Sequence, residues 1–255
     1  MKNSQNYQFK NYLIHQFLEV ESTNDLAFSL AENNQIFANE IIVASKQNKG
    51  RGRINRNWES PIGNLYFSLI LQPKIAVEKI SQISFVAVCA LQIAVEKIFK
   101  QQKIVANVQN KWPNDLLINQ KKVAGILLES KISNDDCKFV ILGIGLNIDS
   151  NPDGTIFPAT NIKNFLCEIS PTKMLEFFLE EFENLYENWL NFGFKNIRNL
   201  WLKNAYNLNY QTRINLGDSY AEGIFQEIDE EGNFLLKTHA NEIKKITFGD
   251  VSGGI

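Results

Sequence analysis

A short cationic loop carries the residues most suited to chemistry. Residues 46–58, KQNKGRGRINRNW, hold five Lys or Arg and no acid within their first eleven positions. Gly50 and Gly52 lie between the charges, and glycine lets a backbone approach a ligand closely. Arginine offers a planar fork of donors that matches a phosphate or a carboxylate. The loop therefore suits an anionic ligand, although charge alone fits a solvated loop or a nonspecific nucleic-acid patch equally well.

Two residues at the ends of this loop favour a small-molecule site. Trp58 follows the basic run and is a large aromatic placed where a purine ring could stack on it. Gln47, at the entrance of the loop, offers both a donor and an acceptor. The loop is also too short and too interrupted by polar residues to be a disordered tail.

A second polar group, Ser22-Thr23-Asn24, lies before a predicted helix that begins at Asp25. All three residues are good N-cap types. Their spare hydroxyl and N–H groups could instead bind the polar head of a ligand at the helix start. Taken alone, the triplet favours the simple cap.

The elements that must position these residues follow from apolar patterning. Strands are predicted over residues 12–20, 40–45 and 64–71, so the cationic loop connects two strands. Residues 80–101 have apolar positions at helical spacing and predict a long helix packed on the core. A second amphipathic helix is predicted over residues 171–191, and a further helix extends to about residue 207.

The block VQNKWPNDLLINQKKVAGILLESKI, residues 108–132, predicts a hairpin. Pro113 excludes a helix there, and strands 116–118 and 123–128 flank a turn at Asn119 and Gln120. The next apolar run, residues 139–148, predicts a buried strand. Its glycines, Gly143 and Gly145, leave space beside the backbone.

Near Tyr206 the pattern changes to short strands separated by turns, which is typical of a small β-barrel. The predicted strands are residues 212–216, 221–228, 234–239 and 243–248. From Gln211 onward the chain has eight Asp or Glu against four Lys or Arg, which argues against nucleic-acid binding by this part.

Composition narrows the class of protein. The chain has 255 residues and a net charge of −2, so no overall field recruits nucleic acid. Three distant cysteines and two histidines disfavour a zinc site, and free thiols fit a reducing cytoplasm. The N-terminus has no apolar signal-peptide region. The longest apolar stretch, about residues 83–94, is expected to be too short to span a membrane.

Four blocks, in order, resemble the bacterial biotin protein ligases, also called biotin–acetyl-CoA-carboxylase ligases. These blocks are ESTN, QNKGRGRxxRxW, KWPNDLLINxxKVAGIL and GIGLNI. The resemblance runs from Ser22 to Asn147 and resumes in the C-terminal β-region. It implies an α+β fold: a mixed-sheet catalytic domain of the class II synthetase-like type over residues 1–206, and a small SH3-like β-barrel over residues 207–255.

The resemblance also implies a reaction in two steps. The biotin carboxylate attacks the α-phosphate of ATP to give biotinyl-5′-AMP, with Mg²⁺ as cofactor. A lysine of the biotin carboxyl carrier protein or domain, from acetyl-CoA carboxylase or another biotin-dependent carboxylase, then attacks the mixed anhydride. No enzyme nucleophile is needed.

By position, the family's contacts fall on two groups of residues. The biotin contacts fall on Ser22, Thr23, Asn24, Gln47, Arg51, Gly52, Arg53, Lys122 and Gly125. The ATP and adenylate contacts fall on Gly50, Arg56, Trp58, Lys111, Asn114, Asp115 and Asn147. Asp115 is also a weak candidate for holding Mg²⁺ through water, with a turn-forming Asn-Asp as the alternative interpretation.

Two anionic reactants repel each other, so the site needs cations. The candidates are Arg51, Arg53, Arg56, Lys111 and Lys122, and of these Lys122, Arg51 and Arg53 are the predicted catalytic residues. Strand alternation predicts Lys122 and Ala124 on one face, with Val123 and Gly125 on the other.

Two departures from the family pattern matter. Asn55 stands where glycine is common, and asparagine tolerates a positive φ better than most residues. About twenty residues precede Glu21, too few for the three-helix DNA-binding module that some members carry. We therefore expect a dedicated cytoplasmic ligase that binds neither DNA nor a membrane; the sequence does not decide between a monomer and a homodimer. A lipoate or octanoate transferase-type relative and a non-catalytic biotin or nucleotide-binding regulator remain the alternatives.

Overall fold

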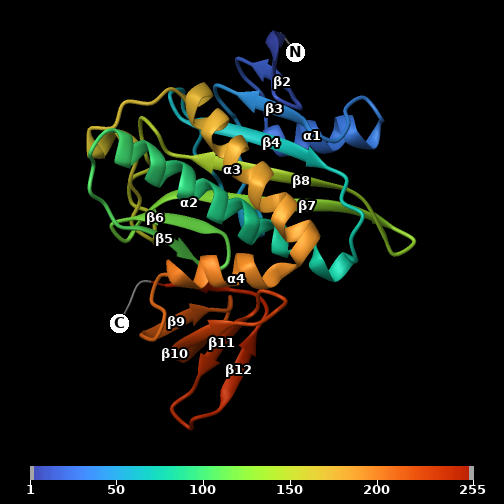
Figure 1. The fold of residues 1–255 in the computed structure, drawn as a ribbon. Helices are drawn as coiled ribbons and strands as arrows, with labels where there is room; N and C mark the ends of the chain where they lie inside the picture. Colours follow the sequence, from blue (N-terminus) through green and yellow to red (C-terminus); the bar gives the residue numbers. More distant parts are fainter. Residues whose placement is uncertain (1–2, 253–255) are drawn as a thin grey trace.

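The computed structural model describes residues 3–252 and has a large mixed sheet with a smaller sheet below it (Figure 1). The large sheet has eight strands in the order β1-β2-β3-β4-β8-β7-β6-β5. β2 and β3 run parallel, and the other neighbouring pairs are antiparallel. Its strands are β1 (Asn3–Phe9), β2 (Tyr12–Phe17), β3 (Glu40–Ala44), β4 (Leu65–Leu71), β5 (Val108–Lys111), β6 (Asp115–Ile118), β7 (Lys121–Ser133) and β8 (Asp136–Leu146).

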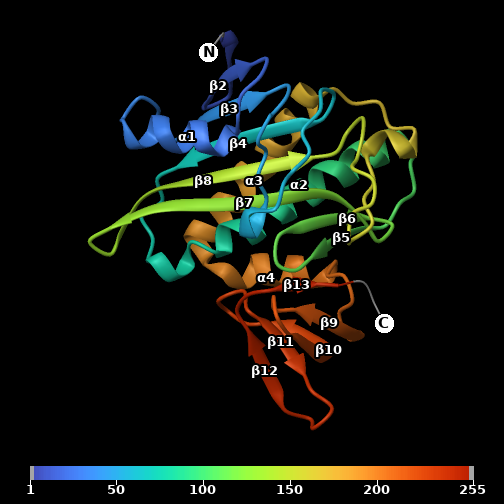
Figure 2. The ribbon, with the colours of Figure 1, turned by 180° about the vertical axis from the view of Figure 1, so that it is seen from behind.

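Helices cover both faces of this sheet. The long helices α2 (Gln82–Gln101) and α3 (Pro171–Phe192) lie on the face seen in Figure 1, whereas α1 (Thr23–Glu32) lies on the opposite face, seen in Figure 2. Successive side chains of β3 point to opposite faces of the sheet. Ile41 belongs to the core under α2 and α3, and Ile42 packs on the side of α1.

The helical stretch Val77–Gln101 is long and apolar enough to cross a membrane, contrary to the expectation of a shorter stretch. However, 78% of its apolar window is buried inside the protein, where it packs against α3. Apolar residues occupy most positions of this helix because it is covered on nearly all sides.

The C-terminal region forms a five-stranded sheet in the order β12-β11-β10-β9-β13. It joins the large sheet through α4 (Phe194–Lys203), which lies between the two sheets in Figures 1 and 2. A turn of this sheet also docks onto the segment between β5 and β6, because Trp112 Nε1 donates to the Gly232 carbonyl at 3.0 Å. The strands are β9 (Gln211–Asn215), β10 (Tyr220–Ile228), β11 (Phe234–Lys237), β12 (Ile243–Ile246) and β13 (Asp250–Val251).

The predicted fold class is confirmed, and the differences concern where single strands end and which short strands were missed. The strand predicted over residues 12–20 is confirmed as β2, but it ends earlier, at Phe17, and Val20 forms only an isolated bridge with Gln47. Strand β1, which precedes it, was missed. Strands β5 and β13 were also missed. The hairpin turn is confirmed at Asn119 and Gln120, which have φ values of 47° and 62°. The domain division at residue 206 stays a prediction.

Candidate active site

One cavity of about 430 Å³ gathers the predicted site residues on the face of the sheet that carries α1. Every predicted residue except Gly50 lines it. Gly50 instead closes the base of the cationic loop: its carbonyl accepts from Trp58 N at 2.8 Å, and an added Cβ would overlap the Trp58 carbonyl oxygen. Ligand contact therefore fits the other fifteen positions better than Gly50.

At the start of α1, the triplet Ser22-Thr23-Asn24 both caps the helix and contributes to the cavity. Ser22 is the N-cap, because its Oγ accepts from Asp25 N at 3.3 Å. Thr23 instead contacts the entrance of the cationic loop, and its N and Oγ1 donate to Gln47 Oε1 at 2.8 and 3.1 Å. Gln47 Nε2 in turn donates to Ser60 Oγ at 2.9 Å. Capping and site formation thus use different residues of one triplet.

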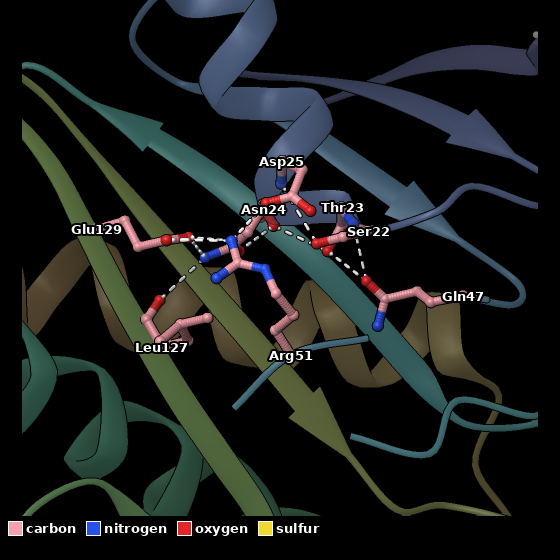
Figure 3. Close-up of polar contacts among 9 residues, drawn as sticks. Ser22, Thr23, Asn24, Asp25, Gln47, Arg51, Leu127 and Glu129 are labelled. Carbon is pink, nitrogen blue, oxygen red and sulfur yellow. Dashed lines mark hydrogen bonds and ion pairs between the residues drawn. The ribbon is translucent and has the colours of Figure 1, made fainter. Parts of the chain in front are cut away.

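Asn24 lies deeper in the same network (Figure 3). Its Oδ1 accepts from Ser68 Oγ at 2.5 Å, and its Nδ2 donates to Glu129 Oε2 at 2.8 Å. The space predicted beside Gly143 is present and is filled by the Asn24 side chain, with which an added Cβ would overlap. Both polar ends of the Asn24 amide are therefore fixed before any ligand binds.

Arg51 lies between two carboxylates (Figure 3). Its Nη2 donates to Asp25 Oδ1, and to Glu129 Oε1 and Oε2 at 3.1 and 3.2 Å. The hydrogen bond to Asp25 is the main reason that the pKa of Arg51 is raised. The positive charge of Arg51 is therefore already compensated by two carboxylates, and its catalytic role stays a prediction.

Asp115 lies between two lysines. Its Oδ2 is 2.9 Å from Lys111 Nζ and its Oδ1 is 2.7 Å from Lys122 Nζ. Asp115 and Lys111 are only 5% and 3% exposed. Burial alone would raise the pKa of Asp115, but the two ammonium groups lower it to about 2.

This arrangement does not fit a magnesium site. Both oxygens of Asp115 already accept from ammonium groups, and a cation placed there would lie beside two positive charges. Within residues 3–252, no group of three or more His, Cys, Asp or Glu is arranged to hold a metal. Asp115 is therefore better explained as the counter-ion of the two lysines, and neither the magnesium role nor the plain turn role describes it.

The predicted face of Lys122 was wrong. A register shift in the β6–β7 pairing places Leu116 opposite Ala124 but Leu117 opposite Lys122, so Val123 is the extra residue. The shift brings Lys122 to the side of Gly125, and a Cβ added at Gly125 would lie 3.4 Å from Lys122 Nζ. A β-bulge reverses the alternation on which the prediction depended.

Trp58 packs against glycines of two adjacent strands, Gly125 of β7 and Gly145 of β8. A Cβ added at Gly145 would overlap the indole, and one added at Gly125 would lie 3.1 Å from its Cζ3. Lys122 Nζ lies 5.3 Å from the centroid of the same ring. Trp58 Nε1 is buried without a hydrogen-bond partner among the described residues, as is Asn147 Oδ1. These two unpaired polar atoms lie on residues that line the cavity, which suits contact with a bound polar ligand.

The rest of the cationic loop contacts the C-terminal region. Asp250 Oδ1 lies 3.4 Å from Arg53 Nη1, and Asp250 Oδ2 lies 2.6 Å from Arg56 Nη1. Arg53 Nη1 also donates to Asn114 Oδ1 at 3.3 Å. Ile54, the residue before Asn55, has a positive φ of 53°.

Sequence reasoning missed three acids that pair with the arginines of the site: Asp25, Glu129 and Asp250. Glu129 had a usable signal, since it follows Gly125 and Leu127 at every second position of β7 and belongs to the same face. Asp250 had none, because nothing local connects it with a loop almost two hundred residues earlier.

Comparisons with known proteins agree with this geometry. Residues 17–147 match the family described as Biotin/lipoate A/B protein ligase, and residues 208–254 match the Biotin protein ligase C terminal domain. The chain is 35% identical over 223 residues to the Biotin–[acetyl-CoA-carboxylase] ligase of Paracoccus denitrificans, covering 85% of this chain and 91% of that protein. It is also 35% identical over 245 residues to the bifunctional ligase/repressor BirA of Bacillus subtilis, covering 92% and 72%. Among solved structures, the biotin protein ligase from Aquifex aeolicus in complex with biotin and ATP matches with a TM-score of 0.79 at 29% identity, covering 96% of this chain and 98% of that one.

Proposed function

The chain belongs to the biotin/lipoate A/B protein ligase family and is a biotin protein ligase, as its motifs predicted, and from this premise we propose the course of its reaction. The enzyme joins biotin to ATP as biotinyl-5′-AMP and then transfers biotin to one lysine of a biotin carboxyl carrier protein or domain. The observation that carries this proposal is a continuous cavity with a preorganised polar end and a cationic end. Its volume of about 430 Å³ is in the usual range for small-molecule sites.

Biotin would lie at the end of the cavity near the start of α1. The groups available there are amides, hydroxyls and a charge-compensated arginine, which suit a neutral polar ring system. Its residues are Ser22, Thr23, Asn24, Gln47, Arg51 and Gly52.

The nucleotide would lie toward Trp58 and the C-terminal sheet. Trp58 offers an indole face and an unpaired Nε1, and Asn147 offers an unpaired Oδ1. Arg53 and Arg56 both pair with the carboxylate of Asp250. Phosphate oxygens of the nucleotide can replace this carboxylate as their partner. Lys111, Asn114 and Asp115 complete this end.

Lys122 and Gly125 lie where the two ends meet. Lys122 Nζ contacts Asp115 and lies over Trp58, so its ammonium group is held between the proposed biotin and nucleotide positions. In the first step, a biotin carboxylate oxygen bonds to the α-phosphorus while pyrophosphate leaves. Lys122 and Arg53 would lower the repulsion between the two anions, which is greatest as the new bond forms.

Magnesium would enter with the phosphates of ATP, since the described residues offer no fitting direct site. In the second step, the neutral amine of the acceptor lysine attacks the carbonyl of the mixed anhydride and AMP leaves. Closure of the cationic loop would protect the adenylate from water during the interval.

The carboxylase partner is inferred from the acceptor named in the Paracoccus enzyme. The proposal places the reaction in the cytoplasm, where the described thiols Cys89, Cys137 and Cys167 remain free.

We include no repressor activity in this proposal. The described N-terminal residues form a β-hairpin of the large sheet, β1 with β2. The net charge of −2 gives no general attraction to DNA. A gel shift should show no sequence-selective complex; a salt-resistant, sequence-selective shift at nanomolar protein would contradict this part.

The decisive experiment is biotin transfer to a purified biotin carboxyl carrier domain, followed by the mass of the acceptor. Lipoate and octanoate serve as competing acyl donors, because the family description includes lipoate ligases. We expect a mass increase that requires both biotin and ATP, with pyrophosphate release. Transfer of lipoate in preference to biotin would favour the transferase-type alternative, and biotin binding without pyrophosphate release would favour a non-catalytic regulator.

A further inference from the structure

Glu129 takes part in the site without lining its cavity. Within the described residues, the cavity wall includes Leu127 of β7 but not Glu129, whose side chain is 28% exposed. Figure 3 shows Glu129 directed from β7 toward Arg51 and Asn24, which both line the cavity. Glu129 can therefore act on a ligand only through these two neighbours.

Glu129 is also the one residue that connects them. Its Oε1 and Oε2 accept from Arg51 Nη2 at 3.1 and 3.2 Å, and Oε2 accepts from Asn24 Nδ2 at 2.8 Å. Through Asn24 the network continues to Ser68 Oγ and then to Thr23 Oγ1. The carboxylate therefore joins the guanidinium to the polar groups at the start of α1.

Asp25, the second acid on Arg51, lacks this property. Its side chain is 51% exposed, and among the described contacts it accepts from Arg51 alone. It can add charge to the cluster, but it does not connect Arg51 with Asn24. Asp25 therefore only compensates the charge of Arg51, whereas Glu129 also connects Arg51 with Asn24.

We propose that Glu129 is a positioning residue of the biotin end, where it fixes the orientation of Arg51 and Asn24 together and thereby sets the affinity for biotin. This inference rests on the proposed function, which places biotin at that end. The role requires a carboxylate, because both partners of Glu129 are donors. A glutamine would match one donor with its oxygen and face the other with its own NH₂ group.

The test compares Glu129→Gln with Asp25→Asn in the full-length enzyme. Biotin affinity is measured by calorimetry, and the KM values for biotin and ATP and kcat are measured by pyrophosphate release. In Glu129→Gln we expect the Kd and KM for biotin to rise roughly 10- to 100-fold, as for loss of one hydrogen bond to a charged group. The KM for ATP and kcat at saturating biotin should change less than about threefold, because catalytic groups elsewhere are untouched.

Asp25→Asn removes one charge from the same arginine and is the matched control. We expect its Kd for biotin to change less than about threefold, as for an exposed ion pair. Equal losses in both variants would overturn the proposal, because charge on Arg51, and not orientation through Glu129, would then explain the effect. Unchanged biotin affinity in Glu129→Gln would overturn it as well.

A double variant tests the connection itself. Asn24→Asp alone places two carboxylates against each other, whereas Asn24→Asp with Glu129→Gln restores a donor opposite an acceptor and the original net charge. The double variant should bind biotin at least about tenfold more tightly than Asn24→Asp alone, giving a non-additive cycle. Additive losses would refute the coupling. Wild-type enzyme that binds no biotin would instead refute the proposed function, and this inference with it.

Discussion

The two ends of the cavity have opposite charge patterns. At the start of α1, one arginine, Arg51, lies between the carboxylates of Asp25 and Glu129. At the other end, one carboxylate, Asp115, lies between the ammonium groups of Lys111 and Lys122. The first cluster has one negative charge in excess and the second has one positive charge in excess. The cavity therefore repels an anion at one end and attracts it at the other, which orients a substrate that is polar at one end and anionic at the other.

Burial distinguishes the clusters as much as charge. Asp115 and Lys111 are almost fully buried, whereas the side chains of Arg51 and Asp25 are 30% and 51% exposed. Charges removed from water interact strongly and are costly to leave unpaired, and exposed pairs contribute little. Substitutions at the lysine end should therefore have the larger effects.

The largest expected effect is on stability, in Asp115→Asn. The variant leaves the buried Lys111 and its neighbour Lys122 without their counter-ion, which should cost about 3–5 kcal/mol of unfolding free energy. Urea unfolding measures this difference. Asp136→Asn, at the start of β8 in the next hairpin, is the control, since that acid is 77% exposed and its pair with Lys138 is superficial. Equal stability of both variants would show that the lysine end is not the more tightly coupled one.

Lys122→Met should have the next largest effect, on catalysis. The variant keeps the apolar stem and removes the charge between the two anions, so adenylate formation should fall about 100- to 1,000-fold. Transfer from pre-made biotinyl-5′-AMP should suffer less, because that step no longer joins two anions. Stability should fall less than in Asp115→Asn, since Lys111 still pairs with the buried carboxylate.

The adjacent Lys121→Met is the control for Lys122, because Lys121 is exposed at the hairpin end. Pyrophosphate release and single-turnover transfer are compared in both variants. Near-normal pyrophosphate release by Lys122→Met would remove this lysine from the mechanism and leave it as a counter-ion of Asp115.

Acid should weaken the lysine end selectively. The pKa of Asp115 is lowered to about 2 in the folded protein from an ordinary value of 3.8. A depressed folded pKa stabilises the protein above the unfolded value, and this stabilisation is lost as the pH falls from about 4 to about 2. The loss should be roughly 2 kcal/mol. Urea unfolding at pH 5 and pH 2 should show this extra loss in wild type relative to Asp115→Asn; identical pH dependence would contradict it.

The sequence predicted all three members of the lysine cluster but only Arg51 of the arginine cluster. Motif order and strand patterning placed Lys111, Asp115 and Lys122 in one hairpin region, and the structure confirms that they meet. The face of Lys122 was wrong because a bulge is set by pairing with β6, which periodicity along one strand does not contain.

Ion pairs between residues far apart in the sequence were the other feature that the sequence did not predict. Arg51 appeared as a free cation because its two acids lie at positions 25 and 129, and their proximity depends on how α1 packs over β3, β4 and β8. Asp250 approaches the loop only through the docking of the small sheet. Local sequence thus indicates which groups a site contains, whereas tertiary packing decides which of their charges are already compensated.

The smallest expected effect concerns the cationic loop, whose arginines are held only by partly exposed pairs. Asp250 pairs with Arg53 and Arg56, whose side chains are 27% and 57% exposed. We predict that the segment from Gly50 to Arg56 is mobile without ligand and becomes ordered by biotinyl-5′-AMP. Asp250→Asn should increase trypsin cleavage after Arg53 by about two- to fivefold in the empty enzyme, as expected for weak surface pairs.

Biotin and ATP together should suppress this cleavage in wild type and in Asp250→Asn, because phosphate oxygens then replace the carboxylate as partners of the arginines. Asp218→Asn, which changes an exposed acid in a turn of the same small sheet, is the control and should leave cleavage unchanged. Equal cleavage with and without ligands would refute the ordering of the loop. Equal cleavage of wild type and Asp250→Asn without ligands would show that Asp250 does not restrain it. Among the charged groups of the nucleotide end, the pairs of Asp115 with Lys111 and Lys122 would then be the ones formed before substrates bind, which sharpens the comparison of the two ends.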